Sequence, residues 1–340
     1  MTYTLSPVHT DAYYVERTRE LVALAPDFIC IKDPTGLLTP QRGRTLFPAV
    51  IRAAGGIPVQ LHSHCQSGLA PEVYSVAIES GFRFGYTASE PLANGASLPA
   101  TEEIGARARK LGCDTSLDAE VLAEVAGYFS WLCEREGKPR GRIARYDPAL
   151  YEHQIPGGMI SNLRYQLETM GIADRMPEIL EEAARVRCDL GYPIVVSPFA
   201  QYIVTQATLN VVQGERYKTI PDEIRKYACG YYGKLAAEPS PEFLERANIR
   251  PDEYVAEAPA AHIEPWIPRL RAQLGPGASD EDVLLAAFYD RELVAELEDP
   301  VPRCTFHTTP LAELVAFFTR RSDIEYARVR FAGTEMTFSA

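Results

Sequence analysis

Two histidines stand at the end of a short apolar stretch near the start of the chain. The stretch Ile57–Gly68 is entered through Pro58 and left through a glycine, which is the pattern of a buried strand followed by a loop. Side chains alternate between the two faces of a strand, so His62 and His64 project to the same side, about 7 Å apart along the strand. Two imidazoles on one face can bind a single divalent cation. A bare H-x-H pattern is equally compatible with two polar side chains bonded to neighbouring backbone.

A lysine lies at the end of a second apolar stretch, Phe28–Asp33, just before the turn that Pro34 and Gly36 indicate. A lysine at the end of a buried strand is costly unless it is paired, modified or deprotonated. Beside two histidines, Lys32 can serve a metal directly or, after reaction with carbon dioxide, as a carbamate with oxygen ligands and a negative charge. The alternative is a lysine that extends to solvent from the end of its strand.

The surrounding pattern predicts four strand–helix units in the first third of the chain. Apolar strands are expected at the following positions, each followed by helical spacing: 3–7, 28–33, 57–63 and 82–88. Such alternation is typical of parallel β/α architecture, in which the carboxyl ends of the strands carry the chemistry. Lys32, His62 and His64 all lie at such ends. The sequence therefore predicts a metal site on an α/β part, residues 1–115.

The rest of the chain is predicted to form two further parts. Amphipathic helical segments continue through residues 116–275, and residues 276–340 indicate a small segment with a helix at 310–319 and strands within 327–338. Within the helical part, a short apolar stretch stops at a hydroxyl, Ser197. Since Ser197 precedes a proline, its backbone is restricted toward an extended conformation. Its alternative role is the N-terminal cap of a helix that begins near Phe199.

Composition places the chain among ordinary globular proteins, with 46% hydrophobic and 24% charged residues. A net charge of -12 without a basic stripe argues against nucleic acid as a partner. No apolar run is long enough to cross a bilayer and no leader pattern begins the sequence, so we expect no membrane insertion. Seven dispersed cysteines without a C-x-x-C pair indicate reduced thiols and a cytoplasmic location. Cys65 can be a nucleophile or a small buried hydrophobe, and we favour the latter.

Several short motifs of the chain occur together in a known family. Ile31-Lys32-Asp33 and Leu61-His62-Ser63-His64 resemble motifs of the carboxyltransferase domain of biotin-dependent enzymes, a group that includes pyruvate carboxylase, oxaloacetate decarboxylase and transcarboxylase. The resemblance covers nearly the whole chain, in family order, and continues through the following motifs: Ser6–Thr10, Gln154–Met159, Ser161–Leu163, Val186–Arg187, Asp189–Pro193, Thr205–Ala207, Gly214–Lys218 and Gly230–Gly233. Because so many separate motifs agree, we interpret the chain as a member of this family.

The resemblance implies a metal-centred (β/α)8 barrel covered by a helical funnel. In the family a carbamylated lysine and two histidines bind a divalent metal; the matching residues are Lys32, His62 and His64, and zinc, manganese or cobalt suits such ligands. The metal polarises the 2-oxo acid substrate, pyruvate or oxaloacetate, for exchange of a carboxyl group with biotin. A hydroxyl residue shuttles a proton between biotin and the substrate methyl, and Ser197 matches it. The resemblance thus implies Ser197 and Lys32 as catalytic residues, and Ser197 and Gln201 as biotin-contacting ones.

The chain departs from the family pattern at several points. It begins at what resembles the fifth barrel strand, so the implied fold is the carboxyl-terminal half of a TIM (β/α)8 barrel, then the α-helical funnel and a small α+β segment. Gln66, Tyr86, Phe199 and Ala200 stand where the family has small hydroxyl, acidic or polar residues. Half a parallel barrel leaves two strand edges unpaired and its inner face wet. We therefore expect a partner chain with the missing amino-terminal half, or self-association into a homo-oligomer.

The predicted function is carboxyl transfer between carboxybiotin and a 2-oxo acid, as one part of a split biotin-dependent carboxyltransferase. Biotin is expected on a separate biotin carboxyl carrier protein or carrier domain. One alternative, which Tyr86 and Phe199 favour, is a catalytically inactive assembly or regulatory subunit with the family fold. A weaker alternative is another metal-dependent lyase or aldolase on a related barrel. The joint presence of Lys32, His62 and His64 favours the transferase, since a silent subunit has no chemical need for all three.

Overall fold

The computed structural model of the chain divides into two compact units, Met1–Pro259 and Ala260–Ala340. The structure describes residues 1–255, 257, 261, 263–290, 292–294, 314, 317–318, 321, 324, 326–331 and 334–339. The domain boundaries that the sequence predicts, after residues 115 and 275, are finer than this division into two units and stay predictions.

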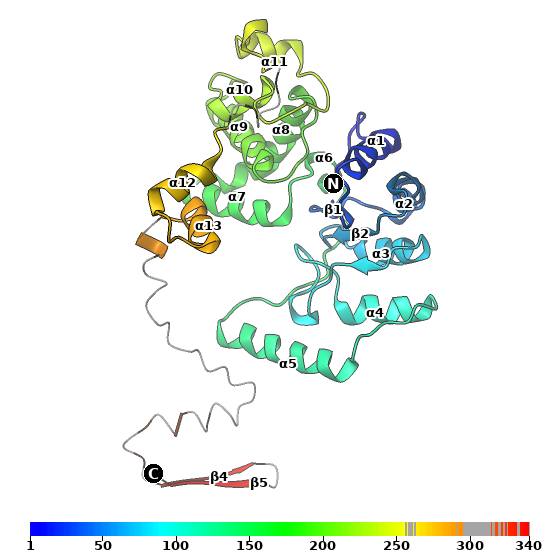
Figure 1. Cartoon of the computed structure of the whole chain (residues 1–340), viewed down its shortest axis with the longest axis vertical. Helices are drawn as coiled ribbons and strands as arrows, with labels where there is room; N and C mark the ends of the chain where they lie inside the picture. Colours follow the sequence, from blue (N-terminus) through cyan, green and yellow to red (C-terminus); the bar gives the residue numbers. More distant parts are fainter. Residues whose placement is uncertain are drawn as a thin grey trace. The chain divides into compact units, whose positions relative to one another are not determined.

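The first unit begins with alternating strands and helices and continues through helices (Figure 1). Its elements in chain order are α1 (Asp11–Val22), β1 (Ile29–Asp33), α2 (Pro40–Ala54), β2 (Val59–Ser63), α3 (Ala70–Glu79), β3 (Phe84–Gly85), η1 (Glu90–Leu92), α4 (Thr101–Lys110), α5 (Ala119–Arg135), α6 (Ala149–His153), α7 (Gly157–Thr169), η2 (Ala173–Arg175), α8 (Met176–Asp189), α9 (Phe199–Gln213), α10 (Asp222–Ala228), α11 (Pro241–Arg246) and η3 (Pro251–Glu253). The order agrees with the predicted β/α alternation followed by helices, except that residues 3–7, predicted as the first strand, form no strand and only a single bridge at Thr2 precedes α1.

The strands of the first unit form a parallel sheet in the order β1–β2–β3. Thr2 adds a parallel bridge to Lys32 at the outer edge of β1, where Tyr3 N donates a hydrogen bond to Lys32 O at 2.7 Å. The first residues of the chain therefore lie beside β1 like a further strand. β3 is shorter than the strand expected at 82–88. It pairs only with β2, through two residues, and Phe84 is 56% exposed.

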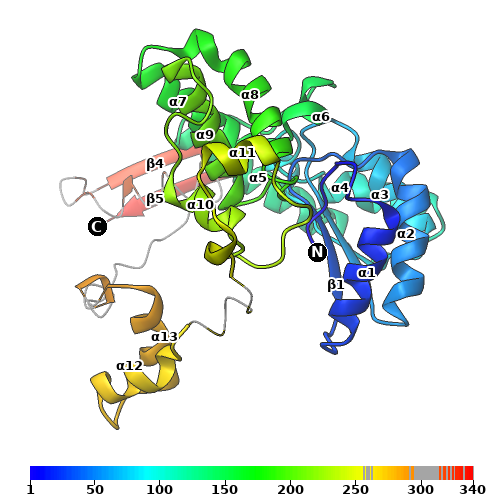
Figure 2. The same ribbon diagram turned by 90° about the horizontal axis from the view of Figure 1, so that it is seen from above.

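The sheet has one buried face and one open face. Ile31 and Leu61 are fully buried in a core that includes Phe47 of α2. The alternation of side chains places Lys32 and His62 on the opposite face, where they are exposed and half-buried respectively. In Figure 2, α1, α2 and α3 lie together on one side of β1. The residues with candidate chemistry thus point away from the core that the helices cover.

Local sequence explains why α2 follows β1 so closely. Thr39 Oγ1 accepts a hydrogen bond from Arg42 N at 3.1 Å, which caps the helix, and Pro40 occupies its first turn. Gly55, at a φ of +62°, ends it. The cap at Thr39 and the glycine at position 55 therefore define where α2 begins and ends between β1 and β2.

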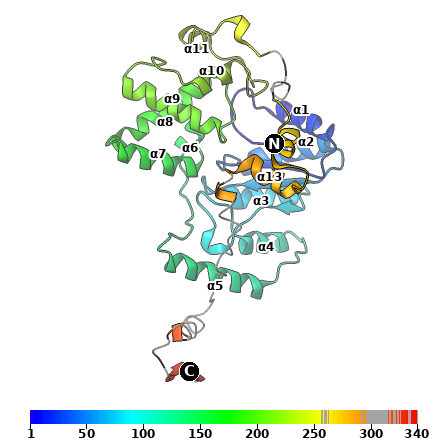
Figure 3. The ribbon, with the colours of Figure 1, turned by 60° about the vertical axis from the view of Figure 1, so that its left-hand side comes forward.

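Helices α8 and α9 pack together at the centre of the helical part (Figure 3). Ile179, Ala183 and Val186 of α8 recur at spacings of four and three residues and are fully buried against Ile203 and Ala207 of α9. This spacing is typical of a helix with one apolar face, in agreement with the helical character predicted for this part of the chain.

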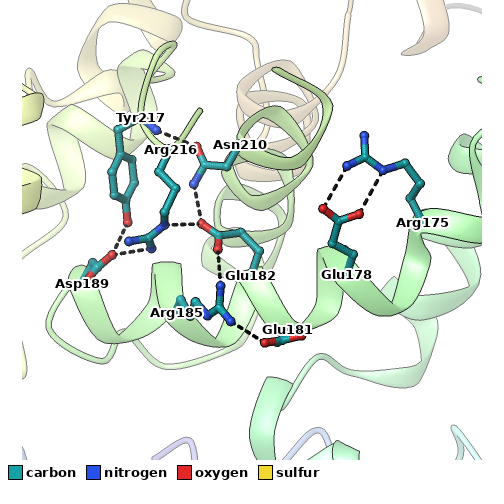
Figure 4. Close-up of polar contacts among 9 residues, drawn as sticks. All are labelled: Arg175, Glu178, Glu181, Glu182, Arg185, Asp189, Asn210, Arg216 and Tyr217. Carbon is teal, nitrogen blue, oxygen red and sulfur yellow. Dashed lines mark hydrogen bonds and ion pairs between the residues drawn. The ribbon is translucent and has the colours of Figure 1, made fainter. Parts of the chain in front are cut away.

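A polar group of residues also joins α8 to α9 and to the turn that follows α9 (Figure 4). We call it the Glu182 cluster, and its members are Glu182, Asp189, Asn210, Arg216 and Tyr217. The buried Glu182 carboxylate accepts hydrogen bonds from Asn210 Nδ2 and Arg216 Nε, each at 2.7 Å. Asp189 accepts from Arg216 Nη2 and from the Tyr217 hydroxyl, also at 2.7 Å. Burial alone lowers the pKa of Arg216, but its bonds to the two carboxylates raise it overall.

The second unit contains α12 (Trp266–Leu274), α13 (Asp280–Phe288) and an antiparallel pair, β4 (Tyr326–Phe331) with β5 (Thr334–Ser339). The two strands agree with those predicted within 327–338. Most of the helix predicted at 310–319 lies outside the described residues. Within the described ranges, no helix combines the length and apolar character needed to cross a membrane.

Candidate functional site

The pairing of β1 with β2 places Lys32 beside His62. The two residues are partners in the parallel register, so their side chains leave the sheet on the same open face. Lys32 is exposed, and its ammonium makes no hydrogen bond or ion pair with any other described residue. This matches the expectation of a lysine that extends to solvent, and it also leaves the amine accessible to carbon dioxide.

The two histidines converge at the end of β2. His62 Nε2 and His64 Nε2 are 3.1 Å apart. His64 Nδ1 lies 2.6 Å from Ala96 O, and because a carbonyl oxygen only accepts, Nδ1 carries a proton. Burial, with smaller effects of His64 and Lys32, lowers the pKa of His62 to about 4. Two imidazole nitrogens at this separation are compatible with metal–nitrogen bonds of about 2.0–2.1 Å to one ion, or with one shared proton.

The remaining ligands for a metal are not all present. Within the described part of the chain, no group of three or more His, Cys, Asp and Glu gathers as a metal site. Lys32 as a carbamate would add an oxygen ligand to the two imidazoles, and water or another chain would complete the set. Tyr86 packs on His62 with ring centroids 5.2 Å apart, and its hydroxyl donates to Gln60 Oε1 at 2.9 Å. An aromatic ring therefore covers one side of His62.

The loop after β1 holds the backbone of His64 in place. The carboxylate of Asp33 is fully buried and accepts two backbone N–H groups of the loop and the Ser63 hydroxyl, each at 2.9 Å. Burial raises the pKa of Asp33, although these hydrogen bonds oppose the shift. Gly36 has a φ of +72°, and a Cβ there would lie 2.3 Å from His64 O. Only glycine permits this close approach, so the loop and the histidine are positioned together.

Ser197 and Gln201 lie at the start of α9, in the helical part. Ser197 is exposed, and Pro198 occupies the N-cap position without any side-chain cap. The alternative role of Ser197 as the cap of this helix is therefore wrong. Gln201 is exposed and donates to Thr205 Oγ1 at 3.4 Å. In the described residues, no hydrogen bond or ion pair joins Ser197 or Gln201 to the histidines at the sheet.

Phe199, next to Pro198 at the start of α9, belongs to an aromatic group. Its ring centroid lies 6.1 Å from that of Tyr202, 5.3 Å from that of Tyr227 and 5.7 Å from that of Tyr232, with edge-to-face geometry in each case. Aromatic side chains thus pack together two residues after Ser197.

Cys65 is a buried hydrophobe, as predicted, and not a nucleophile. It is 1% exposed, and burial, together with Glu103, raises the pKa of its thiol to about 12. The cysteines within the described residues are all free thiols, and Cys304 lies outside them.

Sequence reasoning did not single out a hydrogen-bonded group that links the sheet to the helices. We call it the Arg187 cluster, and its members are Thr4, Thr35, Gln154 and Arg187, all buried. Arg187 Nη2 donates to Thr4 Oγ1 at 3.0 Å, and Thr4 Oγ1 donates to Gln154 Oε1 at 2.8 Å. Thr35 Oγ1 donates to Gln154 O at 3.0 Å. The available signal was the position of Arg187, which lies four residues after Ala183 on the apolar face of α8.

The fold is that of a carboxyl transferase domain. The chain superposes on the carboxyl transferase domain of Rhizobium etli pyruvate carboxylase with a TM-score of 0.79 and 20% sequence identity, covering 99% of this chain and 59% of that one. At this level of identity the similarity establishes the fold.

The sequence establishes the family. A family model described as the conserved carboxylase domain matches residues 150–333. The chain is 39% identical over 310 residues to a pyruvate carboxylase subunit of Methanocaldococcus jannaschii, covering 88% of this chain and 54% of that protein. It is 31% identical over 293 residues to the methylmalonyl-CoA carboxyltransferase 5S subunit of Propionibacterium freudenreichii subsp. shermanii, covering 84% and 58%. The chain belongs to the conserved carboxylase domain family, as its motifs predicted, and it spans about half the length of these relatives.

Proposed function

We propose that the chain carries out carboxyl transfer between carboxybiotin and a 2-oxo acid, pyruvate or oxaloacetate, as one part of a split biotin-dependent carboxyltransferase. The observation that carries this proposal is the convergence of His62 Nε2 and His64 Nε2, 3.1 Å apart, beside Lys32 at the ends of two parallel strands. The relatives named as a pyruvate carboxylase subunit and as the methylmalonyl-CoA carboxyltransferase 5S subunit support the reaction class.

The proposed architecture is the carboxyl-terminal half of a (β/α)8 barrel with a helical funnel. Its sheet is parallel, its outer face is covered by helices, and its open face carries Lys32 and His62, as the interior of a barrel would. A complementary chain, or another part of a longer protein, supplies the other strands, and copies of the assembly associate into a homo-oligomer. Biotin arrives on a biotin carboxyl carrier protein, and the free cysteines support a cytoplasmic location.

Carbamylated Lys32, His62 and His64 hold a divalent metal, which we propose to be zinc, manganese or cobalt. When bound, this metal acts as a Lewis acid on the keto group of the substrate. The chain prepares the site for it, because the Ala96 carbonyl fixes the tautomer of His64 and burial keeps His62 neutral.

Ser197 moves the proton of the transfer. The carboxyl group leaves the ring nitrogen of biotin and bonds to the substrate methyl carbon, which gives up a proton. Ser197 Oγ accepts that proton and gives its own hydroxyl proton to the ring nitrogen, so the serine is restored in each turnover. Its exposure, and the absence of a hydrogen bond to it within the described residues, leave the hydroxyl available. Gln201, one helical turn further along α9, contacts the biotin ring.

A catalytically silent assembly subunit is the second candidate. It is favoured by Tyr86, whose ring lies against His62 in place of an acidic residue, and by Phe199 beside Ser197. Two experiments decide between the candidates.

The first experiment measures metal in the purified chain by elemental analysis. We expect about one divalent ion per wild-type chain and almost none in a His62→Ala/His64→Ala variant, because two ligands are lost together. Gln60→Ala, a change two residues earlier on the same face of β2, is the matched control and keeps the ion. Equal metal content in the wild type and the double variant would contradict the metal site.

The second experiment measures turnover of a complete system that contains the complementary chain and carrier-linked biotin. Ser197→Ala should lower turnover roughly a hundredfold without changing the melting temperature, whereas Ser197→Thr keeps a hydroxyl and most of the activity. Normal turnover of Ser197→Ala would refute the shuttle. A wild-type chain that binds metal and assembles, yet turns over nothing, would establish the silent subunit instead.

A further inference from the structure

Arg187 is a buried cation that no carboxylate balances. Arg187 is 4% exposed, and its guanidinium makes no ion pair with any other described residue. Burial lowers the pKa of Arg187 to about 10. An unbalanced buried guanidinium is costly. Arg216, which packs against the same helix, has two carboxylate partners instead. In place of a carboxylate, Arg187 has two hydrogen bonds to neutral oxygens and the ring of Tyr192, whose centroid lies 5.7 Å from its guanidinium carbon.

The two hydrogen bonds of Arg187 reach two segments that are far apart in the sequence. Arg187 Nε donates to Pro193 O at 3.0 Å, and Nη2 donates to Thr4 Oγ1 at 3.0 Å. Pro193 lies four residues before Ser197, in the connection between α8 and α9. Thr4 follows the residues that pair with β1. One side chain thus bonds both the segment that leads to Ser197 and the edge of the sheet.

The hydrogen bonds continue from Thr4 to the loop next to the metal residues. Thr4 Oγ1 donates to Gln154 Oε1, and Thr35 Oγ1 donates to Gln154 O. Thr35 lies three residues after Lys32 and precedes Gly36, which abuts the carbonyl of His64. An unbroken series of buried hydrogen bonds therefore runs from Pro193 to the loop that places His64.

We propose that Arg187 is a positioning residue, which holds the segment Pro193–Ser197 at a fixed place relative to the strand ends that carry Lys32 and His64. The inference rests on the proposed function of these residues. A guanidinium suits the task because its rigid planar fork directs two donors at two acceptors at once, which lysine or an apolar side chain cannot do. A displacement of about 1 Å between reacting groups can lower a rate about a hundredfold.

The test replaces Arg187 and Thr4 singly and together, in order to separate an effect on the position of Pro193–Ser197 from an effect on the stability of the protein. Arg187→Met and Thr4→Val are each expected to destabilise the protein, because each leaves a buried polar partner unpaired. The double variant removes the Arg187–Thr4 hydrogen bond from both sides, although Pro193 O and Gln154 Oε1 still lose a donor, so its loss of stability should be smaller than the sum of the two single losses. Arg216→Met is the matched control: it removes a hydrogen-bonded arginine that packs against α8 without touching the path to the sheet.

The readouts are amide exchange of peptides covering 189–202, metal content, and turnover in the complete system. For the double variant we expect faster exchange in 193–198, unchanged metal content and turnover per folded chain lowered at least about tenfold. Arg216→Met should lose stability, while its exchange in 193–198 and its turnover per folded chain match the wild type.

The outcomes separate this inference from the proposed function. If the wild type shows no turnover but exchange in 193–198 rises only in the Arg187 variants, the positioning role stands and the proposed function fails. Where the wild type is active, a double variant with wild-type turnover overturns the inference. Lost turnover without any change of exchange in 193–198 also overturns it, because Arg187 then acts in some other way.

Discussion

The Arg187 cluster and the Glu182 cluster both involve α8, and they differ in what balances the arginine. In the Glu182 cluster, Arg216 is bonded to the carboxylates of Glu182 and Asp189, and these bonds raise its pKa. In the Arg187 cluster, Arg187 bonds only neutral oxygens, and burial lowers its pKa to about 10. The first cluster joins α8 to α9 and to the turn directly after α9, whereas the second connects residues 4, 35, 154 and 187.

This difference separates two uses of a buried polar group. A charge bonded to opposite charges holds neighbouring elements together, and removing one partner is strongly destabilising. A charge bonded to neutral groups of distant segments contributes less stability but keeps those segments in one geometry. The variants below test that division by comparing free energies of unfolding.

The largest effect is expected at Glu182, which is 5% exposed. Glu182→Ala removes the acceptor of Arg216 Nε and Asn210 Nδ2 and should lower the free energy of unfolding by about 3 kcal/mol, measured by urea denaturation. Glu182→Gln keeps an amide oxygen as acceptor and should lose less. A loss below about 1 kcal/mol for Glu182→Ala would show that the cluster does not stabilise the helices.

Acid should destabilise the protein through two buried histidines, His9 and His153, of which His9 lies near Arg187 and His153 precedes Gln154. Burial lowers the pKa of His9 to about 4, with a further effect of Arg187, and burial lowers that of His153 to about 4 against the opposing effect of Asp147. Both titrate near 6.5 when unfolded. Between about pH 6.5 and pH 4 the unfolded chain therefore binds more protons, so stability that is complete above pH 6.5 falls as the pH is lowered.

We expect each of these two histidines to contribute a loss of about 2 kcal/mol in the free energy of unfolding between pH 7 and pH 4.5, measured by urea denaturation. His9→Gln cannot take up its proton and should show a smaller loss over the same interval. Identical pH dependence in this variant and the wild type would mean that His9 is not held neutral beside Arg187.

A smaller effect is expected at Thr4, which both accepts from Arg187 and donates to Gln154. Thr4→Val keeps the shape and removes the hydroxyl, and should cost about 1–2 kcal/mol in the same denaturation measurement. The two clusters share no partner, so the losses of Thr4→Val and Glu182→Ala should add within about 0.5 kcal/mol in the double variant. A coupling energy above about 1 kcal/mol would show that the two clusters do not stabilise the protein independently.

The smallest effect is expected at Arg175, which bonds Glu178 at 2.9 and 3.0 Å on the surface near the start of α8 (Figure 4). Both side chains are partly exposed, at 34% and 55%. Arg175→Ala should change the free energy of unfolding by no more than about 0.5 kcal/mol, because exposed ion pairs are screened by solvent. A cost as large as that of Glu182→Ala would show that burial does not distinguish the pairs.

Much of the candidate site could be predicted from local patterns. The strand ends at Lys32, His62 and His64 follow from short apolar stretches between Pro and Gly, and alternation alone places the two histidines on one face. Ser197 could be predicted as the end of an apolar stretch, but its role as a cap was excluded only by the observed start of α9.

The sequence by itself determined the β/α order, the family and the identity of the candidate metal residues, because these depend on neighbours along the chain. Tertiary structure alone decided that Lys32 pairs with His62, that the Ala96 carbonyl sets the tautomer of His64, and that Arg187 meets Thr4. These contacts join residues 30 to 183 positions apart. Local periodicity reports which face a side chain takes, whereas the partner that it meets there depends on how the elements pack.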